Sequence, residues 1–318
     1  MQTIMLTAVA LLPPVFFLFY VLRNDRLEPE PAGLILKALL LGAASVFPAA
    51  VIEAVVLKMP PFTAGGLTGA ALQSFIVIAP AEEALKLAAV LLFIWKHPAF
   101  NEENDGIVYT VAASIGFAMF ENVFYVFQHG IGTGMMRAMT SIPMHVFTGI
   151  LMGYFIGLAK FDTDTGGSGK IFTGFVIACI IHAVYDTFAL SGTSLAALII
   201  PLVIVTIIAG NIALKKGRLL SEKRWGKAPP RAAAAPAAVQ PAQTAGRGTW
   251  KIVISRFLFA VSAIFWALII IGVTTGTAAA KGKSSVTDAI LGAVIITGLP
   301  VFIGVILELS RKRQLRRV

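Results

Sequence analysis

Long apolar runs, separated by short polar segments, repeat along most of the chain. Each run is continuous rather than alternating, and each is long enough to cross a hydrocarbon core of about 30 Å as a helix. A helix satisfies its own backbone hydrogen bonds, which lipid cannot do. The pattern predicts an all-α, polytopic integral membrane protein with about nine transmembrane helices. The expected spans lie at about residues 3–22, 33–57, 66–95, 107–128, 137–159, 170–190, 195–214, 253–275 and 287–309.

The third apolar run is too long for one straight crossing, and Pro80 lies inside it. A proline in a helix interior removes a backbone hydrogen bond and clashes with the preceding turn. We therefore expect this run to be kinked near Pro80 or to be split into a half-span and a full span.

A change in composition divides the chain into three parts. The segment from about Gly217 to Gly248 is rich in Ala and Pro, as in APPRAAAAPAAVQPAQTAGRG, which is typical of a disordered linker. We expect a seven-span unit at 1–214, an Ala/Pro-rich basic cytoplasmic linker at 215–250, and a C-terminal two-helix transmembrane hairpin with a basic tail at 251–318.

Composition and charge support a membrane location. Hydrophobic residues make up 57% of the chain and charged residues 13%, which is too few charges for a soluble surface. The net charge of +10 comes from Lys and Arg in segments between spans, so it indicates topology and contact with anionic lipid headgroups, at the linker and the tail, rather than nucleic-acid binding. This distribution predicts a multi-pass protein of the cell inner (plasma) membrane with its N-terminus outside and its C-terminus cytoplasmic.

Four of the expected spans carry ionisable residues, which are costly in lipid and therefore indicate a functional site. The third span contains PAEEALK, in which Lys86 lies four residues after Glu82 and three after Glu83. On a helix this spacing lets Lys86 pair with one or both carboxylates. Adjacent glutamates point about 100° apart, so one can face a polar cavity while the other is held by the amine. A structural ion-pair cluster is the alternative.

The fourth, fifth and sixth spans contribute the remaining candidates, which are Glu121, Asn122, His145, His182 and Asp186. The spacing of His182 and Asp186 puts both on one helical face, where the carboxylate can orient the imidazole or both can bind one metal. Each group alone could be a polar clamp between helices or a packed side chain. In the expected topology, however, all of them lie between the middle and the outer third of the membrane, which predicts one shared hydrated cavity.

A cavity that combines glutamates and histidines indicates hydrolysis. Such residues can bind a zinc ion that keeps one position open for water, or they can activate water directly. Cys179 is the single cysteine, so thiolate ligation and disulfides are excluded. A proton-coupled transporter is the main alternative, because transporters also place Glu, His and Lys at mid-depth. A non-catalytic membrane scaffold is the second alternative.

Taken in order, the four motifs resemble the PrsW family of intramembrane proteases, which is related to the CAAX-processing and bacteriocin-immunity type membrane proteases. The residues that carry the resemblance are Glu82-Glu83-x-x-Lys86, Phe117-x-x-x-Glu121-Asn122, His145 and His182-x-x-x-Asp186. The segment LRNDRLEPEP after the first span also resembles a turn of that family. The resemblance covers about residues 1–214.

The resemblance implies an intramembrane endopeptidase that cleaves a single-span membrane protein, such as an anti-sigma factor, near the extracytoplasmic side. Glu82 or Glu83 would activate water, with Lys86 tuning the pair. Asp186 would orient His182, and Asn122 would stabilise charge or position substrate. Glu121, His145 and His182 would polarise the scissile carbonyl or bind metal. The expected metal ligands, for zinc if a metal is used, are His145, His182, Glu83 and Glu121.

Overall fold

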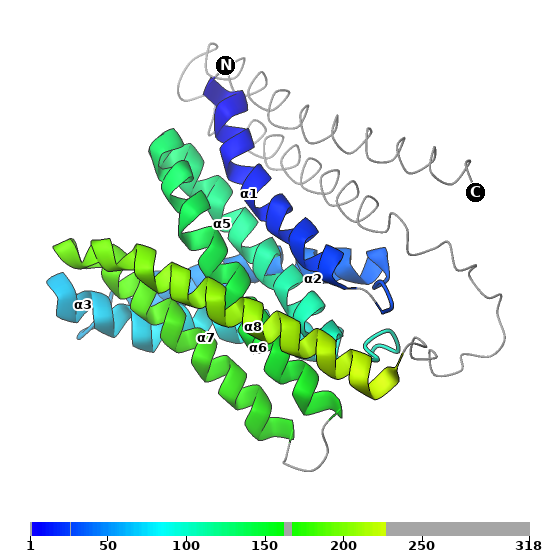
Figure 1. The fold of residues 1–318 in the computed structure, drawn as a ribbon. Helices are drawn as coiled ribbons and strands as arrows, with labels where there is room; N and C mark the ends of the chain where they lie inside the picture. Colours follow the sequence, from blue (N-terminus) through cyan, green and yellow to red (C-terminus); the bar gives the residue numbers. More distant parts are fainter. Residues whose placement is uncertain (1, 26, 162–166, 227–318) are drawn as a thin grey trace, which may run out of the picture.

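The computed structural model describes residues 2–25, 27–161 and 167–226, and the regular secondary structure in these ranges is all helical. The expected C-terminal hairpin, and most of the expected linker, lie outside the described residues. The helices form one bundle in which α8, the last described helix, crosses in front of α6 and α7 (Figure 1). The elements in chain order are α1 (Gln2–Asn24), α2 (Ala32–Val56), α3 (Gly66–Gln73), η1 (Ser74–Ile78), α4 (Ala79–Phe93), α5 (Glu103–Met139), α6 (Ser141–Phe161), α7 (Gly167–Leu190), η2 (Ser194–Leu198) and α8 (Ile199–Trp225).

Five helical segments in the described part of the chain are long and apolar enough to cross a membrane. They are Thr3–Asn24, Ala32–Val56, Glu103–Phe161, Gly167–Leu190 and Ser194–Trp225. The prediction of an all-α polytopic membrane protein is therefore confirmed. The number nine stays a prediction, because the expected third span, at 66–95, is not among these five segments and the last two expected spans fall outside the described residues.

The expected third span is built from three consecutive helical pieces, α3, η1 and α4. The middle piece is a π-helical turn at Ser74–Ile78, and Pro80 follows it in the first turn of α4. A wider π turn just before a proline relieves the clash of the ring with the preceding carbonyl. The sequence located the irregularity correctly, and the π turn brings the segment that holds Glu82, Glu83 and Lys86 into the bundle.

The 59-residue run Glu103–Phe161 crosses the bundle twice, because the chain reverses at Gly130. In a straight helix, Asn122 and Arg137 would be about 22 Å apart along the axis. Instead Nε of Arg137 donates to Oδ1 of Asn122 at 3.0 Å. Gly130 has φ 84° and ψ −174°, a conformation that glycine adopts most readily. The expected fourth and fifth spans are thus joined by a one-residue break, and the residues after it are helical again.

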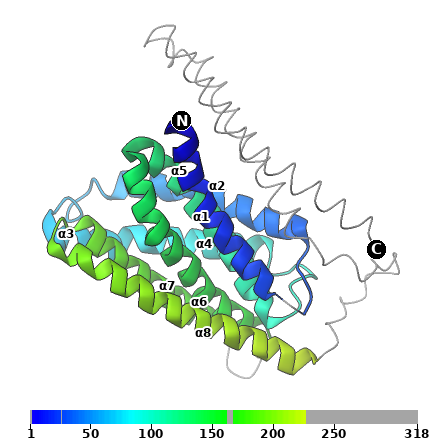
Figure 2. The ribbon, with the colours of Figure 1, turned by 45° about the horizontal axis from the view of Figure 1, so that its top comes forward.

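The first half of α5 is the centre of the bundle. Almost every residue of α5 from Glu103 to Met119 is buried, and α5 contacts α1, α2, α4, α6 and α8. Figure 2 shows α8 along the outer edge of the bundle, with α6 and α7 behind it. A helix that is apolar on all faces is typical of such a central position.

Glycines let the neighbouring helices approach α5 closely. A Cβ on Gly42 of α2 would overlap the backbone of Ala113, and one on Gly116 of α5 would overlap the backbone of Leu39. Close approach through small residues is the usual way in which helices associate in lipid. These contacts fix α2 against α5.

We expect Gly116→Ala to destabilise the protein, because the new methyl group meets the backbone carbonyl of Leu39 and neither can move without shifting a helix. Overpacking of this kind costs about 1–3 kcal/mol. The matched control is Gly132→Ala in the same element, where nothing lies within 4 Å of the added Cβ. Thermal unfolding of purified protein in detergent should show a lower Tm for Gly116→Ala alone. Equal Tm values for both variants would disprove the close contact.

Candidate active site

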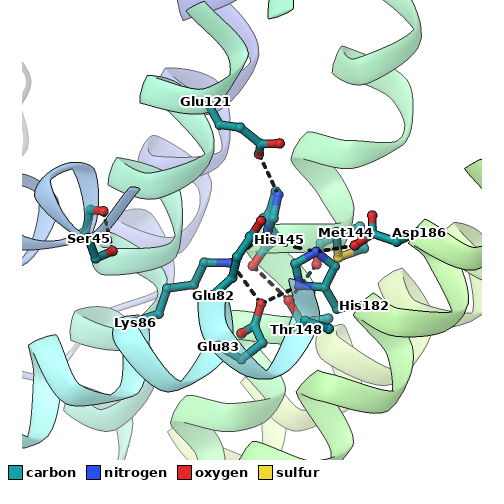
Figure 3. Close-up of polar contacts among 12 residues, drawn as sticks. Ser45, Glu82, Glu83, Lys86, Glu121, Met144, His145, Thr148, His182 and Asp186 are labelled. Atoms are coloured by element: carbon teal, nitrogen blue, oxygen red, sulfur yellow. Dashed lines mark hydrogen bonds and ion pairs between the residues drawn. The ribbon is translucent and has the colours of Figure 1, made fainter. Parts of the chain in front are cut away.

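Lys86 is the centre of the polar cluster (Figure 3). Its side chain is 0% exposed, and its Nζ lies 2.8 Å from Oε1 of Glu83 and 3.3 Å from Oε2 of Glu82. The same Nζ lies 4.2 Å from the centre of the Phe117 ring. The expected i,i+3 and i,i+4 pairing on α4 is therefore confirmed. Because an isolated charge in such surroundings is very costly, each of these groups depends on the others for its burial.

His145 of α6 connects this pair of glutamates to α5. Its Nδ1 lies 3.1 Å from Nζ of Lys86, and its Nε2 lies 3.1 Å from Oε2 of Glu121. An ammonium group only donates, so Nδ1 accepts and Nε2 carries the hydrogen donated to Glu121. Lys86 and Glu121 together thus set the tautomer of His145.

His182 of α7 is held between three carboxylates. Its Nδ1 lies 2.8 Å from Oε1 of Glu83, and its Nε2 lies 3.2 Å from Oδ2 of Asp186. The distance from Nε2 to Oε2 of Glu82 is 3.8 Å, which is too long for a direct hydrogen bond. The two imidazole rings, of His145 and His182, are 5.0 Å apart and nearly perpendicular. The structure therefore brings the charged residues of four expected spans into one cluster.

The two adjacent glutamates differ in their surroundings. The Glu83 side chain is 0% exposed, and its Oε1 contacts both Lys86 and His182. The Glu82 side chain is 8% exposed, and its contacts with Lys86 and His182 are longer. Glu83 is thus fixed in place, whereas Glu82 is held less closely and is slightly exposed.

Asn122 lies beside the cluster rather than in it. Its Nδ2 donates to the backbone oxygen of Ala10 at 2.9 Å, and its Oδ1 accepts from Arg137. The side chain is completely buried, so both polar atoms are used to join α1 to the helix that carries Arg137. In this arrangement Asn122 positions Arg137.

Arg137 lies at the start of the expected fifth span, eight residues before His145, and neither it nor Glu53 is among the site residues expected from the sequence. Nη2 of Arg137 lies 2.9 Å from Oε2 of Glu121, and the guanidinium lies 4.1 Å from the centre of the Tyr125 ring. Glu53 of α2 is within electrostatic range of Glu121 and His182. The reversal at Gly130 brings Arg137 in, and only a three-dimensional arrangement shows this. A carboxylate near the end of an apolar run was the available signal for Glu53.

Glu82, His145 and His182 could together hold a metal ion. Their donor atoms all lie within 4.8 Å of one another, and all three residues are buried. Two imidazoles and one carboxylate are a usual ligand set for catalytic zinc. The four carboxylates of the cluster, Glu82, Glu83, Glu121 and Asp186, outnumber the two permanent cations, Lys86 and Arg137, so a divalent ion also fits the charge. This group contains Glu82, in place of the expected ligands Glu83 and Glu121.

Lys86 limits how such an ion would fit. Its ammonium is 3.1 Å from Nδ1 of His145 and 3.3 Å from Oε2 of Glu82, so it lies between two of the three ligands. A bound metal ion and Nζ in its present position would compete for the same electron pairs of His145 and Glu82. The types of donor fit zinc, but zinc could bind there only if Nζ turned away toward Glu83.

Comparison with known proteins gives a consistent assignment. The sequence model of the "PrsW family intramembrane metalloprotease" matches residues 30–210. The chain is 32% identical over 174 residues to "Protease PrsW" of Bacillus subtilis (strain 168), which covers 55% of this chain and 78% of the relative. It is 32% identical over 206 residues to "Protease PrsW" of Oceanobacillus iheyensis, covering 64% of this chain and 92% of the relative.

A third relative, "Protease PrsW" of Clostridioides difficile (strain 630), is 31% identical over 212 residues, or 65% of this chain and 87% of the relative. No solved structure matches the chain. The family match spans more than half of the chain and includes every helix that contributes to the Lys86 cluster. This multi-pass membrane protein therefore belongs to the PrsW family of intramembrane metalloproteases.

Proposed function

We propose that Glu82 activates the hydrolytic water, and that Glu83 and Lys86 hold Glu82 in position for this role. The observation that carries this proposal is the difference between the two glutamates: Glu83 has contacts of 2.8 Å to both Lys86 and His182, whereas Glu82 has longer contacts of 3.3 and 3.8 Å and an 8% exposed side chain. A base must take up a proton from water and release it to the leaving amine, so it needs a carboxylate oxygen that water can reach.

The water would lie between Glu82 and His182. Oε2 of Glu82 and Nε2 of His182 are 3.8 Å apart, a separation at which polar groups often share a water molecule. Asp186 then acts by holding the ring of His182, and Glu121 acts in the same way on His145. If the scissile carbonyl approaches the two imidazoles, an N–H of His145 or His182 would have to be shared with or released from its present carboxylate partner to reach the developing oxyanion. Oriented donors in a dry site stabilise such a charge strongly.

A zinc ion held by Glu82, His145 and His182 would polarise the same water and the scissile carbonyl. With or without zinc, Asp186 would hold the ring of His182 and Glu121 that of His145. Lys86 balances the negative charge of the two glutamates, and Arg137 balances that of Glu121.

For the substrate, we propose a single-span membrane protein cut near the extracytoplasmic side, such as an anti-sigma factor. The positive residues between the expected spans favour an outside N-terminus. With that orientation Glu121, beyond the midpoint of its crossing, lies toward the outer surface. Contacts of anionic lipids with the linker and basic tail are proposed from the sequence alone, because those residues are not described.

We expect Glu82→Gln to lower proteolysis by about 10²–10⁴-fold without lowering the Tm, because the variant keeps its shape and loses only the group that accepts the proton. Glu83→Gln and His182→Ala should also abolish cleavage, and Glu83→Gln should lower the Tm as well, because it leaves Lys86 short of a buried partner. The exposed pair Arg218–Glu222 supplies the control variant Glu222→Gln.

The assay begins with membrane proteomics of cells that carry wild-type or Glu82→Gln protein, where an uncut substrate should accumulate in the variant. That substrate is then cleaved with reconstituted protein. Full cleavage by Glu82→Gln would exclude the proposed role. Solute flux in liposomes that tolerates Glu82→Gln would favour a transporter instead, and normal cell function without either glutamate would favour a scaffold.

Arg137→Gln should lower turnover by about 10–100-fold, the usual effect of removing a partner that orients a catalytic group. The reason is that Glu121 loses its 2.9 Å ion pair and no longer holds Nε2 of His145. Arg137→Lys, which keeps the charge, should recover part of the activity. Equal turnover by wild type and Arg137→Gln would show that Glu121 does not need this partner.

The donor set predicts about one zinc ion per chain. Elemental analysis of purified protein should find it, His145→Ala and His182→Ala should lose it, and a chelator should inhibit cleavage until zinc is returned. Fully active protein that contains no metal and resists chelators would show that Glu82 acts on water directly.

A further inference from the structure

A second group of buried carboxylates lies far from Lys86, where the turn between α1 and α2 meets the start of α5. Donor oxygens of Asp25, Glu102 and Asp105 lie within 4.8 Å of one another, and all three residues are buried. Asp105 and Glu121 are 16 positions apart on the straight part of α5, which corresponds to about 24 Å. This group is therefore separate from the candidate active site.

The backbone fixes the three side chains so that particular oxygens remain without partners. Oδ2 of Asp105 accepts from the backbone N–H groups of Asn101 at 2.7 Å and Glu102 at 2.8 Å. The Glu102 side chain accepts from the backbone N–H of Asp105 in a reciprocal capping box. Oδ1 of Asp105 and Oε2 of Glu102 are buried and have no hydrogen-bond partner among the described residues. Two buried carboxyl oxygens without partners thus belong to side chains that lie close to a third carboxyl group.

Asp25 is held to the other two by its neighbours. Its Oδ1 accepts from Nδ2 of Asn104 at 3.1 Å, and its Oδ2 accepts from the backbone N–H of Glu30 at 3.3 Å. A fourth carboxylate, Glu30, lies beside Asp105 and accepts a hydrogen bond from the hydroxyl group of Tyr109. Each carboxylate oxygen has a second lone pair, so these bonds leave Asp25 able to bind a further ligand.

No cation in the described part of the chain is paired with the three carboxylates. The ion pairs found there join Lys or Arg to other acids, for example Arg224 to Glu103. Nζ of Lys160 donates to the backbone oxygen of Trp95 and acts on Asp105 through space rather than as an ion-pair partner. Burial and repulsion from Asp105 raise the pKa of Asp25 to about 8 and that of Glu102 to about 9. Both shifts reflect several carboxyl groups that are buried close together without a directly paired cation.

We propose that Asp25, Glu102 and Asp105 bind a hard divalent cation, Mg²⁺ or Ca²⁺, in an all-oxygen site. These ions prefer carboxylate oxygens, whereas zinc prefers sites that include nitrogen or sulfur. The ligands come from the α1–α2 turn and from the start of α5, so the ion would fasten these two segments to each other. Through Asn104, whose backbone N–H donates to Oγ of Ser221 at 3.0 Å, the same corner is joined to α8.

The site would therefore stabilise the end of the bundle opposite the reversal at Gly130. The expected orientation places this end on the cytoplasmic side, where the linker to the C-terminal hairpin begins. A cation there would stabilise the fold without taking part in the reaction at Glu82. Its removal should therefore lower the Tm of the protein directly and affect proteolysis only through that loss of stability.

The test uses full-length protein in detergent, stripped with a chelator and then titrated separately with CaCl₂ and MgCl₂. Unfolding is followed with a thiol-reactive dye on Cys179, the only cysteine. We expect the Tm to rise by about 5 °C or more at a hundredfold excess of the ion over its Kd. Equilibrium dialysis with ⁴⁵Ca²⁺ should find about one ion per chain bound at the Asp25, Glu102 and Asp105 site.

Asp105→Asn and Glu102→Gln should each abolish both the Tm rise and the ⁴⁵Ca²⁺ binding. His182→Ala, which alters the candidate active site, and Glu222→Gln, an exposed acid on α8, should keep both. Asp25→Asn is the substitute if Asp105→Asn does not fold. The proposal is overturned if wild type binds neither ion, or if Asp105→Asn and Glu102→Gln respond like wild type. If Asp105→Asn has a higher Tm than wild type, and if neither Ca²⁺ nor Mg²⁺ changes the Tm of either protein, the carboxyl groups share protons instead of binding a cation.

Discussion

The burial of Lys86 is the constraint on which the rest of the polar centre depends. Its ammonium contacts Glu82 and Glu83 of its own helix and His145 of α6, while Glu83 reaches His182 of α7. An ammonium in an apolar bundle is tolerated only with close partners, and those partners are tolerated only with the ammonium. This mutual dependence forces α4, α6 and α7 into one arrangement, and it leaves Glu82 with longer contacts than Glu83.

The scaffold around this centre follows from two different kinds of close approach. Glycines at the contact of α2 and α5 replace side chains with backbone contacts, so that α5 can be buried on all faces. The reversal at Gly130 then returns the chain along α5 and carries Arg137 to Glu121. One end of α5 thus supports the candidate active site, and the other end brings together the carboxylates of the second cluster. In the candidate active site the charges are balanced by neighbours from other helices, and in the second cluster the proposed cation would balance them.

Much of this arrangement can be predicted from the sequence, because lipid imposes strong rules. Apolar length predicts the helices, and the cost of charge in lipid singles out Glu82, Glu83, Lys86, Glu121, His145, His182 and Asp186. Contacts made by chain reversal cannot be seen in this way, so the sequence does not predict that Arg137 pairs with Glu121 or that Asn122 holds Arg137. Asp25 and Glu102 look like ordinary residues of polar turns, and only burial distinguishes them. The difference between the two glutamates is likewise a matter of contacts rather than of spacing.

The central claim is that Lys86 and Glu83 depend on each other, and a double-mutant cycle measures this directly. The free energy of unfolding would be determined for wild type, Lys86→Met, Glu83→Gln and the double variant in one detergent. Each single change removes a 2.8 Å partner from a buried charge, which keeps only Glu82 or His182 beside it, and should cost up to about 3–5 kcal/mol. The double variant should lose less than the sum of the two, by about 1–3 kcal/mol. Strictly additive losses would contradict the account, since they would mean that the two groups do not interact in the folded protein.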